Sequence, residues 1–273
     1  MDYKSIIVHA QANPEAQGRM RCAADLADRF GGVLIGCGSE AEAVADGDPF
    51  SVAPGELMAL QAEQVEQNIT AAHTAFEAIA KGRDYRWISE HMTPTDALAL
   101  HSRAADLIVT GAPTGDRFDP RRDDDLGLLV IIAGRPVLVT PPQRDYLAAD
   151  RILVCWKDSR EARRAVSDAM PLLTRAKEVL VASVAGPNGL AEACETADEV
   201  AEALRRHGVS ANGEGLLRDE RPVGAILCDR AAAMGADLIV AGGYGRTRLG
   251  EWVFGGVTQS LIRQTERFVL LSH

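Results

Sequence analysis

The pentapeptide Ala105-Asp106-Leu107-Ile108-Val109 recurs unchanged as Ala236-Asp237-Leu238-Ile239-Val240, so that Asp106 and Asp237 lie 131 residues apart. A second pair of stretches, Ile6–Ala16 and Ile152–Ala162, aligns at an offset of 146 residues. Self-similarity at a long, fixed spacing is the sequence signature of a repeated structural unit. We therefore predict two copies of one module, joined head to tail.

Each copy ends on a short apolar strand, Pro136–Val139 in the first and Phe268–Leu271 in the second. We expect these two strands to lie side by side, because pairing them removes two unpaired apolar edges. The offsets of 146 and 131 differ by about 15 residues, so the first copy carries an insertion. The segment Ala41–Pro54, which contains Asp, Gly and Pro, is the predicted insertion.

The segment Pro141–Tyr146 is the predicted linker, because its paired prolines end a strand and oppose a helix. The predicted modules are therefore residues 1–142 and 147–273. Within each, short apolar runs alternate with amphipathic helical patterns such as Arg160–Leu173 and Ala191–His207. Apolar strands separated by helices indicate an α/β fold with a parallel sheet covered on both faces.

The segment Gly242–Thr258 is denser in glycine than a core requires, and it follows the apolar strand Leu238–Ala241. Ligands of parallel sheets bind outside the carboxyl ends of the strands. Gly242 and Gly245 allow close approach of the backbone to an anion, while Arg246 and Arg248 add positive charge. A plain glycine-rich turn is the alternative interpretation.

A second part of this motif is Gly255-Gly256, which precedes a final helix containing Val257 and Leu261. The free N–H groups at the start of a helix form an anion site. Together these features predict a nucleotide-type pocket in the second module. The chain has no G-x-x-x-x-G-K-[ST] and no G-x-G-x-x-G motif, which excludes a P-loop and argues against a dinucleotide-dependent oxidoreductase.

The spacing Gly242-x2-Gly245-x9-Gly255 resembles the signature of the universal stress protein family, in its ATP-binding branch. The opening of each repeat and the closing strands resemble the same family, so the resemblance covers nearly the whole chain. It implies two flavodoxin-like (Rossmann-like) modules, each with five parallel strands in the order 3-2-1-4-5. It also implies a cytoplasmic stress-response protein that dimerises through the last strand of each module. The two copies of this chain could supply both partners as an intrachain pseudo-dimer, with a homodimer of chains as a further expectation.

The resemblance implies ATP or AMP as the ligand, with or without Mg²⁺, in the second module only. The residues that match the phosphate and ribose contacts of the family are Gly242, Gly245, Gly255, Gly256, Val257 and Thr258. Those that match its adenosine contacts are Trp156, Lys157 and Val184, and Arg246 adds positive charge. Two residues depart from the family pattern. Lys157 stands where the family has an acidic ribose acceptor, and Gly256 stands where it has a hydroxyl.

The corresponding stretch of the first module begins at Gly111, and Thr114 replaces its second glycine. Asp123-Asp124-Asp125 lies where phosphates need donors, and like charges repel. Arg121 and Arg122 could pair with these aspartates instead, and we expect the first pocket to bind no nucleotide. His9, at the end of the first strand, is expected to pack beside this pocket rather than to act as a base.

Composition excludes some other functions. The net charge of -10 argues against nucleic acid as a partner, since phosphate backbones are bound by clusters of Lys and Arg. No apolar run is long enough to span a membrane, and no signal peptide is recognised at the start. The 5 cysteines show no metal-binding spacing, which is typical of free thiols in a reducing cytoplasm.

Three functions stay open at this level. The first is a nucleotide-binding stress or regulatory protein with no fast chemistry and no catalytic residues. The second is a slow ATPase or phosphotransferase, for which Asp158 and Glu251 are the nearby acids. The third is a scaffold without a small-molecule ligand, if Lys157 and Gly256 abolish the site. We expect Trp252 and Phe254 to cover the core, with base stacking as the alternative.

Overall fold

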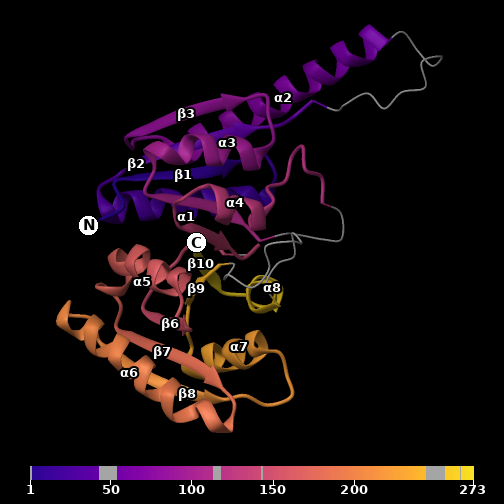
Figure 1. Ribbon diagram of the computed structural model, residues 1–273. Helices are drawn as coiled ribbons and strands as arrows, with labels where there is room; N and C mark the ends of the chain where they lie inside the picture. The colour runs from indigo at the N-terminus through magenta and orange to yellow at the C-terminus, as the bar shows by residue number, and fades with distance from the viewer. Residues whose placement is uncertain (1, 43–53, 113–117, 143, 244–255, 265) are drawn as a thin grey trace.

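A computed structural model describes residues 2–42, 54–112, 118–142, 144–243, 256–264 and 266–273 of the chain. Within these residues, ten strands form one continuous sheet in the order β3-β2-β1-β4-β5-β10-β9-β6-β7-β8 (Figure 1). Each half of this order reads 3-2-1-4-5 from its outer edge to the centre, as the family resemblance implies. The fold is therefore two flavodoxin-like modules whose sheets meet at their fifth strands.

The described residues of the first half build five strands and four α-helices. In chain order they are β1 (Ser5–Ala10), α1 (Pro14–Phe30), β2 (Val33–Ser39), α2 (Pro54–Ala80), β3 (Tyr85–Glu90), α3 (Pro94–His101), the 3-10 turn η1 (Ser102–Ala104), β4 (Leu107–Gly111), α4 (Leu126–Ile132) and β5 (Val137–Thr140). Every strand pair within this half is parallel. The repeated pentapeptide ends in β4, next to β1 at the centre of this half.

The second half repeats the pattern. Its elements are β6 (Arg151–Trp156), α5 (Arg160–Leu173), β7 (Glu178–Ala185), the 3-10 turn η2 (Pro187–Gly189), α6 (Leu190–Arg206), β8 (Ala211–Leu217), α7 (Val223–Met234), β9 (Leu238–Gly242), α8 (Gly256–Gln264) and β10 (Phe268–Ser272). The predicted helix Arg160–Leu173 has the bounds of α5. The helix predicted over Ala191–His207 is α6, and Gly208 beyond it adopts φ +81°, which favours glycine.

The two halves meet where β5 and β10 pair. Val139 faces Val269, Leu138 faces Leu270 and Val137 faces Leu271, and this pair is antiparallel whereas its neighbours are parallel. The predicted proximity of the two last strands is therefore observed. The pairing leaves β3 and β8 as the outer edges of the sheet.

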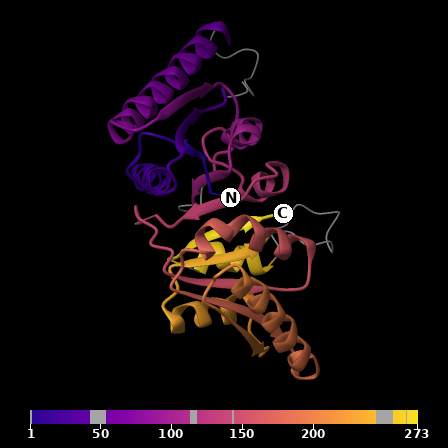
Figure 2. The same ribbon diagram turned by 90° about the vertical axis from the view of Figure 1, so that its left-hand side faces the viewer.

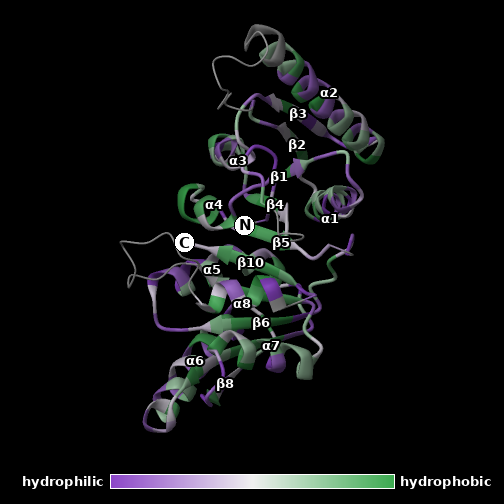
Figure 3. Ribbon diagram, turned by 90° about the vertical axis from the view of Figure 1, so that its right-hand side faces the viewer, coloured by the Kyte–Doolittle hydropathy of each residue, from purple (hydrophilic) through white to green (hydrophobic). Residues whose placement is uncertain are grey.

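Helices cover both faces of the sheet, and each face has its own core. On one face α1, α2, α5 and α6 pack with residues such as Ile6, Val154 and Leu270. On the other face α3, α4, α7 and α8 pack with Ile7 and Leu271. Figure 3 shows apolar strands running through the middle of both halves. Because side chains alternate along a strand, the two cores divide the residues of each strand between them.

On the α1/α5 face the halves are tied together beside the sheet (Figure 2). Tyr3 Oη donates to the carbonyl oxygen of Asp168 in α5 at 2.6 Å, and burial raises the pKa of that phenol. The guanidinium of Arg175 lies 4.1 Å from the centre of the Phe30 ring and donates to the Arg29 carbonyl oxygen at 3.1 Å. These contacts tie the segment before β1 to α5, and the end of α1 to the residue Arg175 just beyond α5.

The additional residues of the first half fall in two places. Residues 43–53 of the predicted insertion lie outside the described residues. The helix that follows, α2, has 27 residues against 17 in its counterpart α6. Part of the extra length therefore extends a helix. Within the described residues no helix combines the length and the apolar character that a membrane crossing requires.

Candidate functional site

At the carboxyl edge of the second half, five half-buried apolar residues surround the ends of three strands. We call this set the apolar shelf, and its members are Cys155, Val184, Leu216, Val223 and Val257. The first three are the penultimate residues of β6, β7 and β8, and the last two lie in the first turns of α7 and α8. All five pack against the core of the α7/α8 face while keeping part of their surface exposed.

The shelf continues to the start of α8 because α7 and α8 pack closely there. A Cβ atom on Gly224 would lie 2.4 Å from Cβ of Ser260 and 3.1 Å from the carbonyl oxygen of Val257. Only glycine at position 224 lets the first turns of these helices approach so closely. The helix α8 begins with Gly256, Val257 and the buried Thr258, so its free N–H groups lie beside an apolar surface.

The structure gives Gly242 a packing role. A Cβ atom at this last residue of β9 would lie 2.6 Å from the backbone nitrogen of Ala162 and 2.7 Å from the carbonyl carbon of Glu161. The first turn of α5 therefore sits directly on the Gly242 backbone. Burial works to raise the pKa of the Glu161 carboxyl there, but hydrogen bonds at the start of the helix hold that pKa below its usual range.

Two of the residues expected to contact the adenosine lie on opposite faces of the sheet. Val184 lies on the α7/α8 face with Val257, whereas Trp156 packs into the core of the α5/α6 face. The Trp156 indole is 8% exposed, and its Nε1–H has no hydrogen-bond partner in the described part of the chain. Lys157 is exposed just beyond β6. The structure thus brings Val184, Val257 and Thr258 to one face and leaves the side chain of Trp156 on the other.

Sequence reasoning missed three shelf residues, Cys155, Leu216 and Val223. Strand alternation could have found Cys155, because a neighbour of Trp156 in β6 must face the opposite side. Several predicted positions lie outside the described residues, and they are Gly245, Arg246, Arg248, Glu251, Trp252, Phe254 and Gly255.

In the first half, a network of buried polar groups occupies the corresponding edge. His9 Nδ1 lies 3.1 Å from Asp124 Oδ1, and Thr110 Oγ1 donates to both oxygens of that carboxylate at 2.8 and 2.9 Å. Burial, with the nearby charge of Arg19, lowers the pKa of His9. Burial works to raise the pKa of Asp124, but the His9 and Thr110 hydrogen bonds and the Arg19 charge hold it below its usual range. A neutral His9 therefore donates from Nδ1 to an ionised Asp124.

Arg19 of α1 and Gln11 close this edge. Arg19 is only 7% exposed, and its Nε donates to the His9 carbonyl oxygen at 2.7 Å. Its Nη2 donates at 2.8 Å to Gln11, whose amide in turn donates to the Arg122 carbonyl oxygen at 2.6 Å. The loop after β1 is thereby tied to the segment before α4. This edge is filled by the protein's own side chains.

The expected partners of the three aspartates were wrong. Arg121 pairs with Asp119 at 2.7 Å, and Arg122 lies 3.4 Å from Glu40. Arg121 reaches Asp119 because the two residues share one tight turn, in which the Arg121 backbone also donates to Asp119. Asp124 instead finds its counter-charge in Arg19 of α1, which is distant in sequence and was not predicted.

Cys37 is the register neighbour of His9 on β2, which raises the question of a Cys–His–Asp arrangement. The Cys37 side chain is completely buried, and burial together with Glu90 raises the pKa of its thiol to about 12. A thiol nucleophile requires a lowered pKa and access to substrate. His9 therefore packs in the first half as expected, and the neighbouring Cys37 is not an activated nucleophile.

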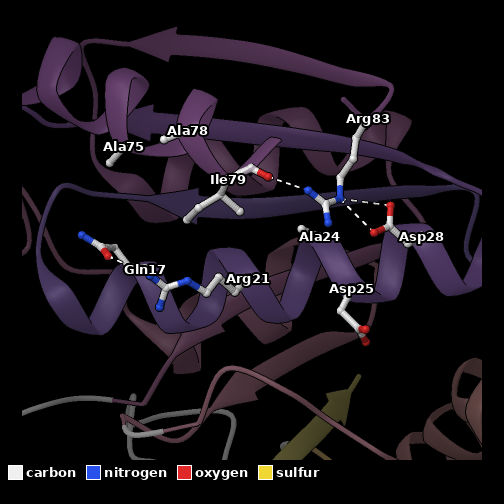
Figure 4. Close-up of a pocket in the computed structure, with 9 residues that line it drawn as sticks. All are labelled: Gln17, Arg21, Ala24, Asp25, Asp28, Ala75, Ala78, Ile79 and Arg83. Atoms are coloured by element: carbon white, nitrogen blue, oxygen red, sulfur yellow. Dashed lines mark hydrogen bonds and ion pairs between the residues drawn. The ribbon is translucent and has the colours of Figure 1, made fainter. Parts of the chain in front are cut away.

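A separate groove of about 480 Å³ lies between α1 and α2 (Figure 4). Its lining includes small apolar residues, Ala24, Ala75 and Ala78, and two of its charged groups, Arg83 and Asp28, pair with each other. Arg83 Nε donates to both carboxylate oxygens of Asp28 at 3.0 and 2.9 Å. The charged side chains thus bind one another rather than converge on a common point. In the described part of the chain no cluster of three or more His, Cys, Asp or Glu side chains could hold a metal ion.

Comparison with known proteins finds a family match for the second half of the chain. Residues 148–273 match the model of the universal stress protein family. A universal stress protein from Archaeoglobus fulgidus DSM 4304 superposes with a TM-score of 0.69 at 14% identity, over 98% of each chain. A protein of unknown function from Pseudomonas aeruginosa PAO1 superposes with a TM-score of 0.57 at 19% identity, covering 99% of this chain and 92% of its own. The search of curated proteins found no relative.

Proposed function

Because the second half of this chain is a universal stress protein domain and the first half repeats its fold, we propose that it is a tandem universal stress protein that binds an adenine nucleotide. The ligand binds to the second module only. The modules are residues 1–142 and 147–273, and ATP or AMP is the expected nucleotide.

The observation that carries the proposal is the apolar shelf. Half-buried apolar side chains beside a few polar groups are the usual lining of a small-molecule site. Cys155, Val184 and Leu216 offer a surface of the kind that packs against a planar base. Val257 joins that surface to the start of α8, where free N–H groups favour an anion.

The phosphates are assigned to the glycine motif and the first turn of α8. Gly256 and Thr258 belong to that turn, and Gly245, Arg246 and Gly255 belong to the adjoining segment outside the described residues. Charge-assisted hydrogen bonds from backbone N–H groups and Arg246 would hold the phosphates. Mg²⁺, where it accompanies ATP, would neutralise part of the phosphate charge.

The residue Lys157 indicates that the ribose contact differs from that of the family. The family acceptor at this position is acidic, whereas a lysine ammonium only donates hydrogen bonds. Lys157 is exposed just beyond the strand end, and its ammonium cannot accept a hydrogen bond from the ribose hydroxyls. The proposed site therefore differs from the family pattern in how it holds the sugar.

The buried Asp124 supports nucleotide binding in one module only. Its carboxylate already accepts hydrogen bonds from His9 and Thr110, and it occupies the edge that corresponds to the apolar shelf. A nucleotide there would need space and donors that the protein's own carboxylate uses. Like charge between Asp124 and a polyphosphate would further oppose binding.

The assembly and location follow the family. We assign the β5–β10 pairing the role of the family dimer contact, so that one chain forms a pseudo-dimer, and a homodimer of chains is compatible with it. The protein is assigned to the cytoplasm as a stress-response protein that acts by binding its ligand, without fast catalysis.

Calorimetric titration with ATP and AMP, with and without Mg²⁺, tests the proposal on the purified chain. We expect one site per chain. Leu216→Glu, which puts a carboxylate on the shelf, should abolish binding, whereas Leu217→Glu should not, because Leu217 is the 54% exposed neighbour facing the other way. Lys157→Asp should tighten binding by about 1–2 kcal/mol through a charged acceptor for the ribose.

Each alternative function predicts a different result when nucleotide is added to the purified chain. Two equivalent sites per chain would overturn binding to the second module only. Slow release of phosphate from bound ATP would favour the ATPase. No heat with either nucleotide, in wild type and Lys157→Asp alike, would favour the scaffold.

A further inference from the structure

The helix α4 is apolar on the side that faces away from the sheet as well as on the side that faces it. Leu129 and Val130 are buried in the core. On the other side Leu128 is half-buried, and Ile131 and Ile132 are 36% and 45% exposed. These last three residues have the spacing i, i+3, i+4 and form one ridge, which we call the α4 ridge. Figure 3 shows α4 in green, the colour of apolar residues, at the outside of the first half.

The corresponding helix of the second half, α8, is polar on this face. In the strand register, Val137 is the partner of Ile108 in the first half. Val269 is the partner of the equivalent Ile239 in the second half, so α4 and α8 align at an offset of 132 residues. At this offset the counterparts of the α4 ridge are Ser260, Arg263 and Gln264. The module therefore folds with a polar helix at this place, and its architecture does not require the α4 ridge.

The helix α3 lies beside α4 and is bonded to it at both ends. At the start of the two helices, the Asp125 N–H donates to Thr95 Oγ1 at 2.8 Å. At their ends, Ser102 Oγ donates to the Ala133 carbonyl oxygen at 2.9 Å. Leu100 of α3 is 42% exposed and adds to the apolar surface there. The α4 ridge thus belongs to a fixed pair of helices, which lowers the entropy cost of binding a partner.

Side chains of opposite charge lie at the two ends of α4. Residues 119–125, before the helix, include four aspartates and two arginines, and each arginine already has an acidic partner. Among these aspartates, the half-buried Asp123 forms no ion pair with any described residue. Beyond the helix lie Arg135 and, next to Ser102, Arg103. Neither arginine forms an ion pair within the part of the chain that the structure describes. One end of α4 is therefore negative and the other positive.

We propose that the α4 ridge is the contact surface of a homodimer, in which α4 packs antiparallel against α4 of a second copy about a two-fold axis. An interface of this symmetry must be self-complementary. The two apolar ridges meet at its centre, and Asp123 at each end meets Arg135 of the partner subunit. A parallel arrangement would instead bring like charges together. This contact is separate from the β5–β10 pairing, which lies within one chain, and it does not depend on the nucleotide.

Exchanging the face of α4 for that of α8 tests the surface. Sedimentation velocity of wild type over about 1–100 μM should show a reversible dimer, as expected for a small interface. The triple variant Leu128→Ser, Ile131→Arg, Ile132→Gln should dimerise at least about tenfold more weakly. Leu217→Arg, at a 54% exposed apolar position of β8, is the control and should dimerise as wild type. Circular dichroism verifies the fold of each variant.

Three results of this experiment would overturn the proposal. The first is a monomeric wild type at every concentration, which would mean that the α4 ridge is covered by the chain itself or by a different protein. The second is a dimer that the triple variant retains. The third is a dimer that Leu217→Arg disrupts as strongly as the triple variant.

Mixing two charge variants tests the antiparallel orientation. Arg135→Glu alone places two carboxylates together at both ends of the interface, and Asp123→Lys alone places two cations together. Each should weaken its own homodimer about tenfold, because like charges across an interface are unfavourable. A mixed dimer pairs opposite charges at both ends, so an equimolar mixture should associate within about threefold of wild type. A mixture that associates no better than either variant alone would contradict the antiparallel contact.

Discussion

Trp156 at the end of β6 occupies the position that Ala10 occupies at the end of β1. The helix that follows shows the reverse difference, since Arg19 of α1 corresponds to Ala165 of α5. All four residues are buried on the α1/α5 side of the sheet. Each half therefore fills this part of its core with one large and one small side chain. The large side chain comes from the strand in the second half and from the helix in the first half. The indole belongs to the packing of the second half.

Truncating this indole should lower the free energy of unfolding more than removing its N–H does. Trp156→Ala should lower the free energy of unfolding by about 3–5 kcal/mol through the cavity that it leaves. Trp156→Phe should lower it much less, because Nε1 has no partner in the described part of the chain. Urea unfolding followed by circular dichroism measures both. Equal losses in the two variants would mean that the N–H has a partner, such as a bound ligand or water.

Asp124→Asn should destabilise the protein by about 3–5 kcal/mol, because it removes the strongest of the negative charges near the buried Arg19. Asp119→Asn is the matched control, since that carboxylate pairs with the exposed Arg121. We expect the control to lose less than about 1 kcal/mol. Guanidinium titrations of the two variants decide the matter, and similar losses would contradict the buried role of Asp124.

Stability should also fall on acidification through His9. Its pKa in the folded protein is lowered, so below about pH 6.5 the unfolded chain binds more protons, and stability is lost as the pH falls. His9→Asn keeps an N–H toward Asp124 but does not titrate. The free energy of unfolding of this variant should therefore decline less than that of wild type between about pH 6.5 and 5. Parallel pH profiles would show that His9 is not the responsible group.

Glycine substitutions should separate packing from binding. Gly242→Ala should destabilise by about 1–3 kcal/mol, because its Cβ would press on the α5 backbone. Gly256→Ser should leave stability nearly unchanged, since a Cβ there meets nothing within 4 Å. The serine restores the hydroxyl of the family pattern, and nucleotide affinity should rise. Thermal unfolding and titration of both variants test this contrast, which fails if Gly256→Ser unfolds as early as Gly242→Ala.

The repeat could be predicted because it depends on patterns that persist along the chain, and the strand order was implied by the family resemblance. The pentapeptide Ala236–Val240 and the helix Arg160–Leu173 lie where strand and helix periodicity puts them. The partner of Asp124 could not be predicted in this way, because Arg19 reaches it through the packing of α1 on the sheet. The split between Trp156 and Val184 was missed for a different reason. A family motif gives positions along the chain but not the face to which each side chain points.

The antiparallel pairing of β5 with β10 within a single polypeptide also has an evolutionary consequence. In a dimer of identical chains every mutation is inherited twice, so a carboxylate that blocks one pocket blocks both. Here Asp124 exists in one half and the apolar shelf in the other, and each can be selected independently. The two halves are also synthesised in equal amounts and cannot be diluted apart, so one half can diverge without a matching change in the other.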